Sequence, residues 1–302
     1  MKIVINTPSG NIGNVVTDVL LQSKHEVVII SRNLEKVNHF VKRGATLIHG
    51  SIDDAVILDR AFQNADALFW LSPPAYHLPN YLDWVEAAAQ TAAKVAKKNH
   101  VKHAVVMSSA GAQYGKGAGP IGALLAVENS FNEAVPNVTI LRAGFFMENF
   151  IHNLETIVKM GTIFSWHPSN KKIPMVATRD IGTKAAEILQ DTNWKGFRII
   201  GVHGPEDINQ TEAADFISKG IELPVKYVEV TIDQLKKGMI GSGMPVHIAE
   251  MLCEMYAAIE CGNAPVLEPR SNETTTNTSL LEFSKTVLKP LVEKIMKGQV
   301  TH

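Results

Sequence analysis

The chain has 302 residues, of which 45% are hydrophobic and 20% are charged, the balance of a globular protein with a large core. Its 29 Lys and Arg residues nearly balance its 30 Asp and Glu residues, so we expect no field that would hold nucleic acid or an anionic membrane. These proportions exclude disordered and fibrous proteins.

The two cysteines, Cys253 and Cys261, lie eight residues apart in one helical pattern. At a rise of about 1.5 Å per residue they are roughly 12 Å apart, too far for a disulfide, and two thiols are too few for a structural zinc site. The first residues do not resemble a signal peptide, and no apolar run approaches the roughly 18 residues of a membrane span. We therefore expect a cytoplasmic protein that holds no metal and has no membrane partner.

Short apolar runs in the first half predict six parallel strands, because each is too short for a helix and continuously apolar, as strands covered on both faces are. The runs are Lys2–Asn6, Glu26–Ser31, Ala45–His49, Ala67–Leu71, His103–Ser108 and Val138–Arg142. Helical patterns alternate with them, most clearly at Tyr81–Asn99. This alternation predicts an α/β fold with a Rossmann-type doubly wound parallel sheet.

After Arg142 the pattern becomes mixed, which predicts a smaller C-terminal α+β lobe. The predicted helices are Phe145–Met160, Asp180–Asp191 with Asp180 as N-cap, Thr211–Lys219, Ile232–Cys261 and Leu280–Met296. Gly241, Gly243 and Pro245 should break the fourth of these, and Gly262 should cap it. The predicted strands are Phe197–Val202 and Tyr227–Val230, and the polar run Glu268–Ser279 should be a surface loop. We place a Rossmann domain at 1–150 and the smaller lobe at 151–302, with the chain crossing between the two.

The first predicted strand leads into a glycine-containing turn and then an apolar helical pattern. The turn reads Thr7, Pro8, Ser9, Gly10, Asn11, Ile12 and Gly13. In this context Gly10 allows the backbone to approach a pyrophosphate, Gly13 allows the helix to lie close to the strand, and the free N–H groups of the helix start face the phosphates. Thr7 stands where such turns often begin with glycine, so we expect it to be extended before Pro8. The alternative is a plain βα turn whose glycines are incidental.

The end of the second predicted strand indicates which dinucleotide the turn binds. An acidic residue there would accept from a ribose 2′-hydroxyl, whereas an arginine would meet a 2′-phosphate. The strand ends with Ser31 and Arg32, and Lys36 follows one predicted helical turn later. These residues favour NADP(H) over NAD(H), although Arg32 could also be an ordinary solvated side chain.

With these residues considered, the chain resembles the NmrA-like family, an atypical branch of the short-chain dehydrogenases/reductases, nearly from end to end. The strings that carry the resemblance are the turn 7–13, Leu71–Pro74, Ser108–Gly111, Glu128, Leu141–Asn149, Arg179–Ile181 and Gly204–Glu206. The resemblance implies that Ser72, Pro73, Pro74 and Ser108, together with Ala143, Gly144, Phe145 and Phe146, contact the cofactor. It also implies that Asn149 and Tyr76 lie at the substrate mouth. Ser72 could instead cap the next segment, and the phenylalanines could be core residues.

The chain departs from this family at two places that bear on function. Related reductases use a Tyr-x-x-x-Lys pair to donate a proton, but Tyr114 is followed four residues later by Ala118, and the next helix has Leu124 where relatives often have Lys or His. Many relatives have an aspartate that meets adenine at position 51, where this chain has Ser51, which leaves Asp53 and Asp54 as substitutes.

Two functions fit these features, and a third interpretation is a structural relic that binds no ligand. The first is an NADPH-dependent oxidoreductase that passes hydride to a small flat acceptor such as a quinone or an azo compound, which needs no dedicated acid. The second is a non-catalytic NADP(H) sensor that regulates a protein partner. Met239, Met244, Met251 and Met255 would form an adaptable pocket wall in the first case, or core packing in either.

Overall fold

The computed structural model describes residues 1–261 and 268–298, so the predicted cap Gly262 lies outside the described residues. The chain forms two compact units. Unit 1 consists of Met1–Arg142, Ile181–Gly201 and Pro265–Glu268, and unit 2 consists of Ala143–Asp180, Val202–Ala264 and Pro269–His302. This division differs from the boundary expected near residue 150, because a helix and a strand from the second half of the sequence belong to unit 1.

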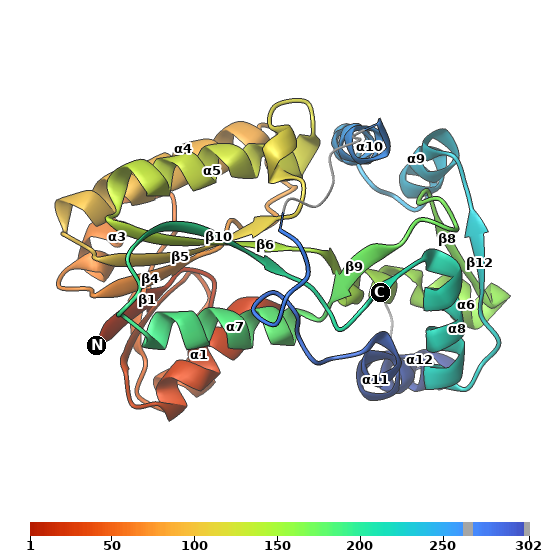
Figure 1. Cartoon of the computed structure of the whole chain (residues 1–302), viewed down its shortest axis with the longest axis horizontal. Helices are drawn as coiled ribbons and strands as arrows, with labels where there is room; N and C mark the ends of the chain where they lie inside the picture. The colour runs from red at the N-terminus through yellow and green to blue at the C-terminus, as the bar shows by residue number, and fades with distance from the viewer. Residues whose placement is uncertain (262–267, 299–302) are drawn as a thin grey trace. The chain divides into compact units, whose positions relative to one another are not determined.

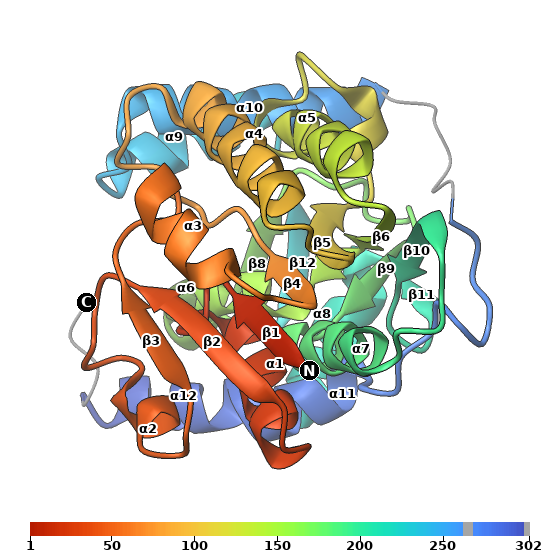
Figure 2. The ribbon, with the colours of Figure 1, turned by 90° about the vertical axis from the view of Figure 1, so that its left-hand side faces the viewer.

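A seven-stranded sheet forms the centre of unit 1, in the order β10-β6-β5-β4-β1-β2-β3 (Figures 1 and 2). Its strands are β1 (Lys2–Ile5), β2 (Glu26–Ser31), β3 (Thr46–His49), β4 (Ala67–Trp70), β5 (His103–Ser109), β6 (Asn137–Ala143) and β10 (Gly196–Val202). Strand β1 pairs in parallel with β2 and with β4, and these pair in parallel with β3 and β5. The order confirms the Rossmann-type fold. The predicted strand Phe197–Val202 is β10 and extends this sheet rather than the smaller lobe.

Helices cover both faces of this sheet. They are α1 (Asn11–Gln22), α2 (Asn38–Val41), α3 (Ala55–Phe62), α4 (Tyr81–Lys98), η1 (Ala112–Tyr114), α5 (Gly119–Ala134) and α7 (Thr178–Gln190). Helices α3, α4 and α5 lie on one face, whereas α1 and α7 lie on the other (Figures 1 and 2). The alanine stripe of α4, including Ala89, Ala92 and Ala96, is fully buried, since small side chains let a helix pack closely against its neighbours.

Unit 2 combines short strands with helices. Its strands are β7 (Phe145–Phe146), β8 (Thr162–Ser165), β9 (Ile173–Val176), β11 (Asp207–Ile208) and β12 (Lys226–Glu229). They form the sheet β11-β9-β7 and the pair β12-β8. The helices are η2 (Met147–Asn153), α6 (Leu154–Met160), α8 (Gln210–Ile221), α9 (Ile232–Gly241), α10 (Val246–Cys261), α11 (Leu280–Phe283), η3 (Ser284–Leu288) and α12 (Lys289–Met296). The predicted break between α9 and α10 is present.

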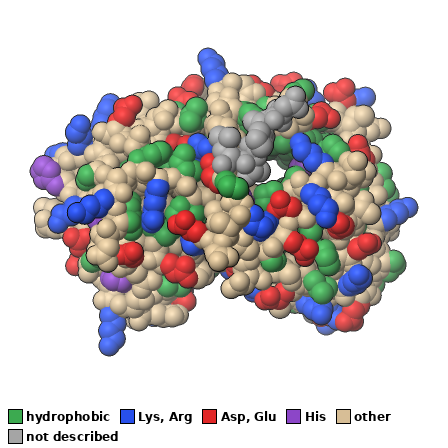
Figure 3. Space-filling view, in the orientation of Figure 1, with side chains coloured by type: hydrophobic (Ala, Val, Ile, Leu, Met, Phe, Trp, Pro, Cys, Tyr) green, Lys and Arg blue, Asp and Glu red, His purple; other side chains and the backbone are tan. Residues whose placement is uncertain are grey.

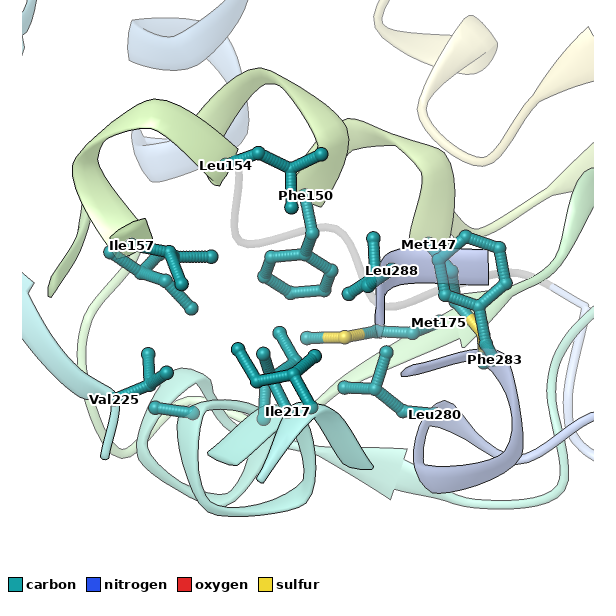
Figure 4. Close-up of a cluster of buried hydrophobic side chains, with 14 of the residues drawn as sticks. Met147, Phe150, Leu154, Ile157, Met175, Ile217, Val225, Leu280, Phe283 and Leu288 are labelled. Carbon is teal, nitrogen blue, oxygen red and sulfur yellow. The ribbon is translucent and has the colours of Figure 1, made fainter. Parts of the chain in front are cut away.

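A separate apolar core holds unit 2 together (Figure 4). Phe150 and Ile157, from η2 and α6, point into it from one side, and Ile217 of α8 and Leu280 of α11 come from the other. Burying such side chains contributes about 1.5–3 kcal/mol each relative to exposure. The last predicted helix, Leu280–Met296, is present as α11, η3 and α12, with one wide turn where Ser284 packs against Gly220.

The helix predicted over Phe145–Met160 is wrong in its first half. Phe145 and Phe146 instead form β7, which pairs in parallel with Met175 and Val176 of β9, and a 3₁₀ segment follows. An apolar run cannot distinguish a short strand from a helix by periodicity alone. The partner strand, about 30 residues away, decides the conformation.

The predicted N-cap role of Asp180 is also wrong. Helix α7 begins two residues earlier, and the Glu148 carboxylate accepts hydrogen bonds from Thr178 N at 3.0 Å and from Thr178 Oγ1 at 2.6 Å. Asp180 instead accepts from Thr278 N and Thr278 Oγ1, at 2.9 and 2.7 Å. Both carboxylates therefore fasten segments of unit 2, and the run Glu268–Ser279 is partly buried, since Thr278 is only 3% exposed.

The surface carries both signs of charge. Figure 3 shows Lys and Arg side chains interspersed with Asp and Glu side chains on the face that it draws, in keeping with the formal net charge of −1. Within residues 1–261 and 268–298, no helix is both long and apolar enough to cross a membrane.

A buried charged network joins four segments of unit 1, namely β5, α5, β6 and the segment at Glu268. Arg142, at the end of β6, donates to the two carboxylate oxygens of Glu128 at 3.0 and 2.7 Å and to Glu268 at 3.0 Å. Ser108 Oγ donates to Glu128 at 2.5 Å. The hydrogen bonds to Glu128 raise the pKa of Arg142 above its ordinary value, against the effect of burial. Bidentate geometry makes this a strong pairing, and it ties the segment at Glu268 to the sheet.

We predict that Arg142→Met lowers the free energy of unfolding by about 3–5 kcal/mol, because it leaves buried carboxylates without their cation. Chemical denaturation of the full chain measures this loss. The matched control is Arg43→Met, which removes an exposed ion pair to Asp18 and should cost about 1 kcal/mol or less. Equal losses in the two variants would contradict the role given to the network.

Candidate functional site

The turn between β1 and α1 brings the helix against the end of the strand. A Cβ atom built at Gly13 would lie 2.0 Å from the Thr7 carbonyl oxygen, which no real side chain tolerates. Thr17, one turn further on, is fully buried and donates from Oγ1 to the Gly13 carbonyl at 2.7 Å. Glycine at position 13 is therefore required by packing, as predicted.

Gly10 differs from Gly13, because the fold does not require glycine there. Its backbone is extended, with φ −82° and ψ 163°, a conformation open to any residue. A Cβ at Gly10 would meet only the Thr7 carbonyl oxygen, at an ordinary 3.7 Å. The residue is exposed. A side chain at Gly10 would therefore occupy the space in front of the turn.

The N-terminus of α1 faces that space with unused donors. Gly10 is its N-cap and supplies no side-chain hydrogen bond, and the first turn contains no acidic residue. A helix start leaves N–H groups without intrahelical partners and carries a partial positive charge, here at Asn11 and Ile12. Thr7 does not have a positive φ. Threonine at the position where such turns often begin with glycine therefore causes no backbone strain.

The parallel pairing brings the ends of the neighbouring strands to the same edge of the sheet as this turn. Strand β1 lies between β2 and β4, which is the switch point where open α/β sheets bind ligands. Asn6 fixes this edge: its Nδ2 donates to the Leu71 carbonyl at 2.9 Å, and its Oδ1 accepts from Leu71 N at 3.0 Å. Sequence reasoning did not single out Asn6, although a buried polar residue at the end of an apolar strand is a usable signal.

Arg32 follows the end of β2 and is exposed. The nearby His49 ring lies 3.2 Å from the Arg32 carbonyl oxygen and so links the ends of β2 and β3. Lys36 does not lie one helical turn after Arg32, because residues 32–37 form a bend and a turn in which Lys36 N donates to Asn33 Oδ1. Both side chains remain exposed cations, but no helix fixes their spacing.

The acidic residues after β3 have separate roles. Asp54 is the N-cap of α3, since its carboxylate accepts from Val56 N at 2.8 Å. Asp53 accepts from Trp84 Nε1 at 2.7 Å. Burial alone would raise the pKa of Asp53, but hydrogen bonds from Ser51 and Trp84 and the charge of Arg32 hold that pKa below its usual value. Asp53, not Asp54, is therefore the carboxylate beside Ser51 and Arg32.

The segment after β4 contains the next predicted site residues. Pro73 and Pro74 follow Ser72, whose buried Oγ has no hydrogen-bond partner among the described residues. Ser72 therefore does not cap a helix. Tyr76 packs edge-on against Tyr81 with ring centroids 5.0 Å apart, and burial raises the pKa of Tyr76.

Tyr114 lies at the end of η1, in a loop rich in unusual backbone conformations. Gly111, Gly115, Gly117 and Gly119 all have positive φ, between 49° and 110°, which agrees with the predicted glycine-rich loop. The position four residues after Tyr114 is the buried Ala118. Ser108, the predicted cofactor residue before this loop, is 3% exposed and its hydroxyl is already bonded to Glu128.

The remaining predicted residues lie in unit 2. Ala143 is buried, and Gly144 N donates to the Val202 carbonyl at 3.0 Å. Phe145 and Phe146 are half-buried in β7, and Phe145 packs on Phe150 of η2. Asn149 is exposed on η2. The four methionines near the helix break are half-buried, so they are not part of the fully buried core.

The sequence alone did not predict an aromatic cluster that the structure shows in unit 2. His167, just after β8, stacks on Trp166 with ring centroids 4.0 Å apart, and Trp166 stacks on Tyr256 of α10 at 5.0 Å. Phe145 meets His167 edge-on at 5.6 Å. Burial, with a smaller contribution from Lys171, lowers the pKa of His167 to about 4. No local motif marks these residues, because they come from three separate segments.

Comparison with known proteins identifies the class. The family model of the NmrA-like family matches residues 1–284, so the chain belongs to the NmrA-like family. It is 28% identical over 255 residues to the NAD(P)H azoreductase of Xenophilus azovorans, covering 82% of this chain and 84% of that protein.

Two solved structures share this fold. The triphenylmethane reductase of Citrobacter sp. in complex with NADP(H) has a TM-score of 0.79 at 22% identity, over 94% of this chain and 99% of that one. The NADPH-dependent quinone oxidoreductase QOR2 of Escherichia coli, in complex with NADPH, has a TM-score of 0.79 at 19% identity, over 95% of this chain and 99% of that one.

The two glycines of the turn provide a matched test. Gly13→Ala should lower the free energy of unfolding by about 3 kcal/mol or more, because its Cβ would collide with the Thr7 carbonyl. Gly10→Ala should change stability by less than about 1 kcal/mol, while Gly10→Val abolishes binding of NADP⁺. Thermal denaturation and calorimetric titration measure the two effects. Normal NADP⁺ affinity in Gly10→Val would show that the turn is not a phosphate site.

Proposed function

We propose that the chain is an NADP(H)-dependent oxidoreductase that transfers hydride to a small flat acceptor such as a quinone or an azo compound. The observation that carries this proposal is Gly10. Neither its backbone conformation nor its surroundings require glycine, yet a side chain there would block the approach of a pyrophosphate to the uncapped start of α1.

In this proposal, the residues of unit 1 would contact a dinucleotide in an order that follows the sheet. The N–H groups of Asn11 and Ile12 would bind the pyrophosphate. Arg32 would meet a 2′-phosphate, with Lys36 as a second, loosely placed cation, and Ser51 with Asp53 would border the adenine. Ser72, Pro73 and Pro74 would flank the nicotinamide ribose, where the unpartnered Ser72 Oγ offers a donor and an acceptor.

In unit 2, Ala143 to Phe146 would border the nicotinamide, and Asn149 would contact the substrate. When bound, NADPH supplies hydride. The chain's residues need only hold donor and acceptor in contact and exclude water, because a quinone or an azo compound can take its proton from solvent after hydride arrives. The azoreductase and the quinone oxidoreductase that the chain resembles are named for such acceptors.

A non-catalytic NADP(H) sensor is the second candidate. It is favoured by the sequence around Tyr114, where Ala118 replaces the lysine of a proton relay. A sensor would bind NADP(H) and a protein partner without turnover.

Oxidation of NADPH, followed by its absorbance, distinguishes the two functions. With menadione or an azo dye as acceptor, the oxidoreductase predicts steady NADPH consumption that stops when acceptor is omitted. Tight NADP⁺ binding with no consumption over a broad set of quinones and azo dyes would overturn the catalytic proposal in favour of the sensor. A melting temperature that does not rise with NADP⁺ would contradict both.

Arg32→Ala should weaken NADP⁺ binding by about 1.5–3 kcal/mol, roughly 10- to 100-fold, because a charge-assisted contact to the 2′-phosphate is lost. Its affinity for NAD⁺ should stay unchanged. Arg43→Ala, which removes an exposed arginine paired with Asp18, is the control and should alter neither affinity. If the wild type binds NADP⁺ and NAD⁺ equally well, the assignment of Arg32 is wrong.

Tyr114→Phe should leave menadione reduction within a few-fold of wild type. The tyrosine lies on a glycine-rich loop with no lysine at the spacing of a proton relay, whereas removing a general acid typically costs about 100-fold or more. Steady-state rates at saturating NADPH measure this difference. A loss of that size with unchanged NADPH affinity would identify Tyr114 as the proton donor.

A further inference from the structure

The aromatic cluster of unit 2 is a layered array with one polar edge. Three near-parallel rings, those of His167, Trp166 and Tyr256, have interplanar angles of 26° and 27°. Phe145 stands at 90° to the imidazole. Aromatic rings in such arrangements attract further flat rings by offset stacking and edge-to-face contact.

The imidazole of His167 is held at one nitrogen and open at the other. His167 Nδ1 lies 3.0 Å from Ser165 Oγ, and that hydroxyl has no other hydrogen-bond partner among the described residues. Within residues 1–261 and 268–298, no group lies in hydrogen-bond reach of Nε2, and Nε2 is not among the fully enclosed atoms. The side chain is nevertheless only 8% exposed. Nε2 is therefore the atom of this mostly buried ring that a ligand can reach and hydrogen-bond.

The backbone around His167 is fixed. Tyr227 Oη lies 2.9 Å from the Ser165 carbonyl oxygen and 2.5 Å from that of His167. Burial raises the pKa of Tyr227 to about 12, so the phenol stays protonated and remains a donor. Strand β12, which carries Tyr227, pairs in parallel with β8 over four residues. His167 lies in the bend just after β8, and the two hydrogen bonds from Tyr227 tie this bend to β12.

The imidazole is neutral near pH 7, because burial disfavours its charged form. If Ser165 Oγ donates to Nδ1, the single ring proton is on Nε2. A neutral imidazole in this tautomer polarises a carbonyl group by hydrogen bonding without giving up its proton. A quinone carbonyl oxygen suits this donor, since negative charge grows on that oxygen as hydride is added.

We propose that Phe145, Trp166, His167 and Tyr256 form the recognition surface for a quinone, whose ring packs on the aromatic cluster while one carbonyl oxygen accepts a hydrogen bond from His167 Nε2. This inference rests on the proposed function, and it names the acceptor class. Hydride carries two electrons and one proton to the quinone as NADPH becomes NADP⁺. The hydroquinone anion then takes its second proton from water, and His167 keeps its own.

Binding to the NADP⁺-loaded protein, which cannot transfer hydride, tests the surface without turnover. Menadione and 2-methylnaphthalene share a ring system and differ by the two carbonyl groups. Menadione should bind to the wild type at least about twofold more tightly than 2-methylnaphthalene does. His167→Phe should keep the stacking, weaken menadione about two- to tenfold, the worth of one hydrogen bond, and leave 2-methylnaphthalene and NADP⁺ unchanged. The control is His152→Phe, an exposed histidine of the same unit, which should change none of the three.

Equal effects of His167→Phe on the two ring compounds, or none on menadione, would overturn the inference. If His167→Phe does not fold, ¹⁵N-histidine spectra of the wild type give the answer. Menadione should shift the Nε2 resonance of one neutral histidine and 2-methylnaphthalene should not; the absence of such a shift overturns the inference.

Failure of the inference is distinguishable from failure of the proposed function. Menadione binding that depends on His167, without NADPH oxidation, would refute the enzyme and retain the surface. Rapid menadione reduction by His167→Phe, with an unchanged KM for menadione, would refute the surface and retain the enzyme.

Discussion

The close approach of α1 to the end of β1 is the constraint on which unit 1 depends. Because position 13 is glycine, the first turn of α1 can lie directly against the Thr7 carbonyl, in the turn that follows β1. Its uncapped N–H groups therefore face the edge of the sheet where β1 lies between β2 and β4. Asn6 joins β1 to the segment after β4 at the same edge, so the turn and the Ser72 segment keep a fixed relation within unit 1.

Much of this arrangement follows from local sequence. The strands of unit 1 are continuous apolar runs, and the glycine turn and the helix break near Gly243 have strong local signals. The errors have a common physical origin, which is contact between distant segments. Phe145 and Phe146 are strand residues because Met175 and Val176 pair with them, and Glu148 rather than Asp180 caps α7. Lys36 was misplaced because the turn at Asn33 replaces the expected helix.

Part of the candidate site, too, could be predicted from local sequence, and part depends on contacts between distant segments. The residues proposed to face the phosphates lie in one short stretch and are evident from sequence, as is the absence of an acid at the end of β2. The cluster around His167 is assembled from β7, the end of β8 and α10, so no spacing rule reveals it. In the proposed reaction, the two parts of the site have different functions. The first selects and holds the dinucleotide, whereas the second selects a flat acceptor through stacking and one hydrogen bond.

A reductase whose residues supply no general acid can work only if the acceptor itself stabilises the negative charge that hydride transfer adds to it. Isotope effects on menadione reduction test this directly, with NADPH deuterated at the transferred C4 position and with reactions run in H₂O and in D₂O. Hydride transfer without a protein acid should give a clear primary isotope effect from the deuterated cofactor and a solvent isotope effect near unity. A large solvent isotope effect that disappears in Tyr114→Phe, or no NADPH oxidation at all, would contradict it.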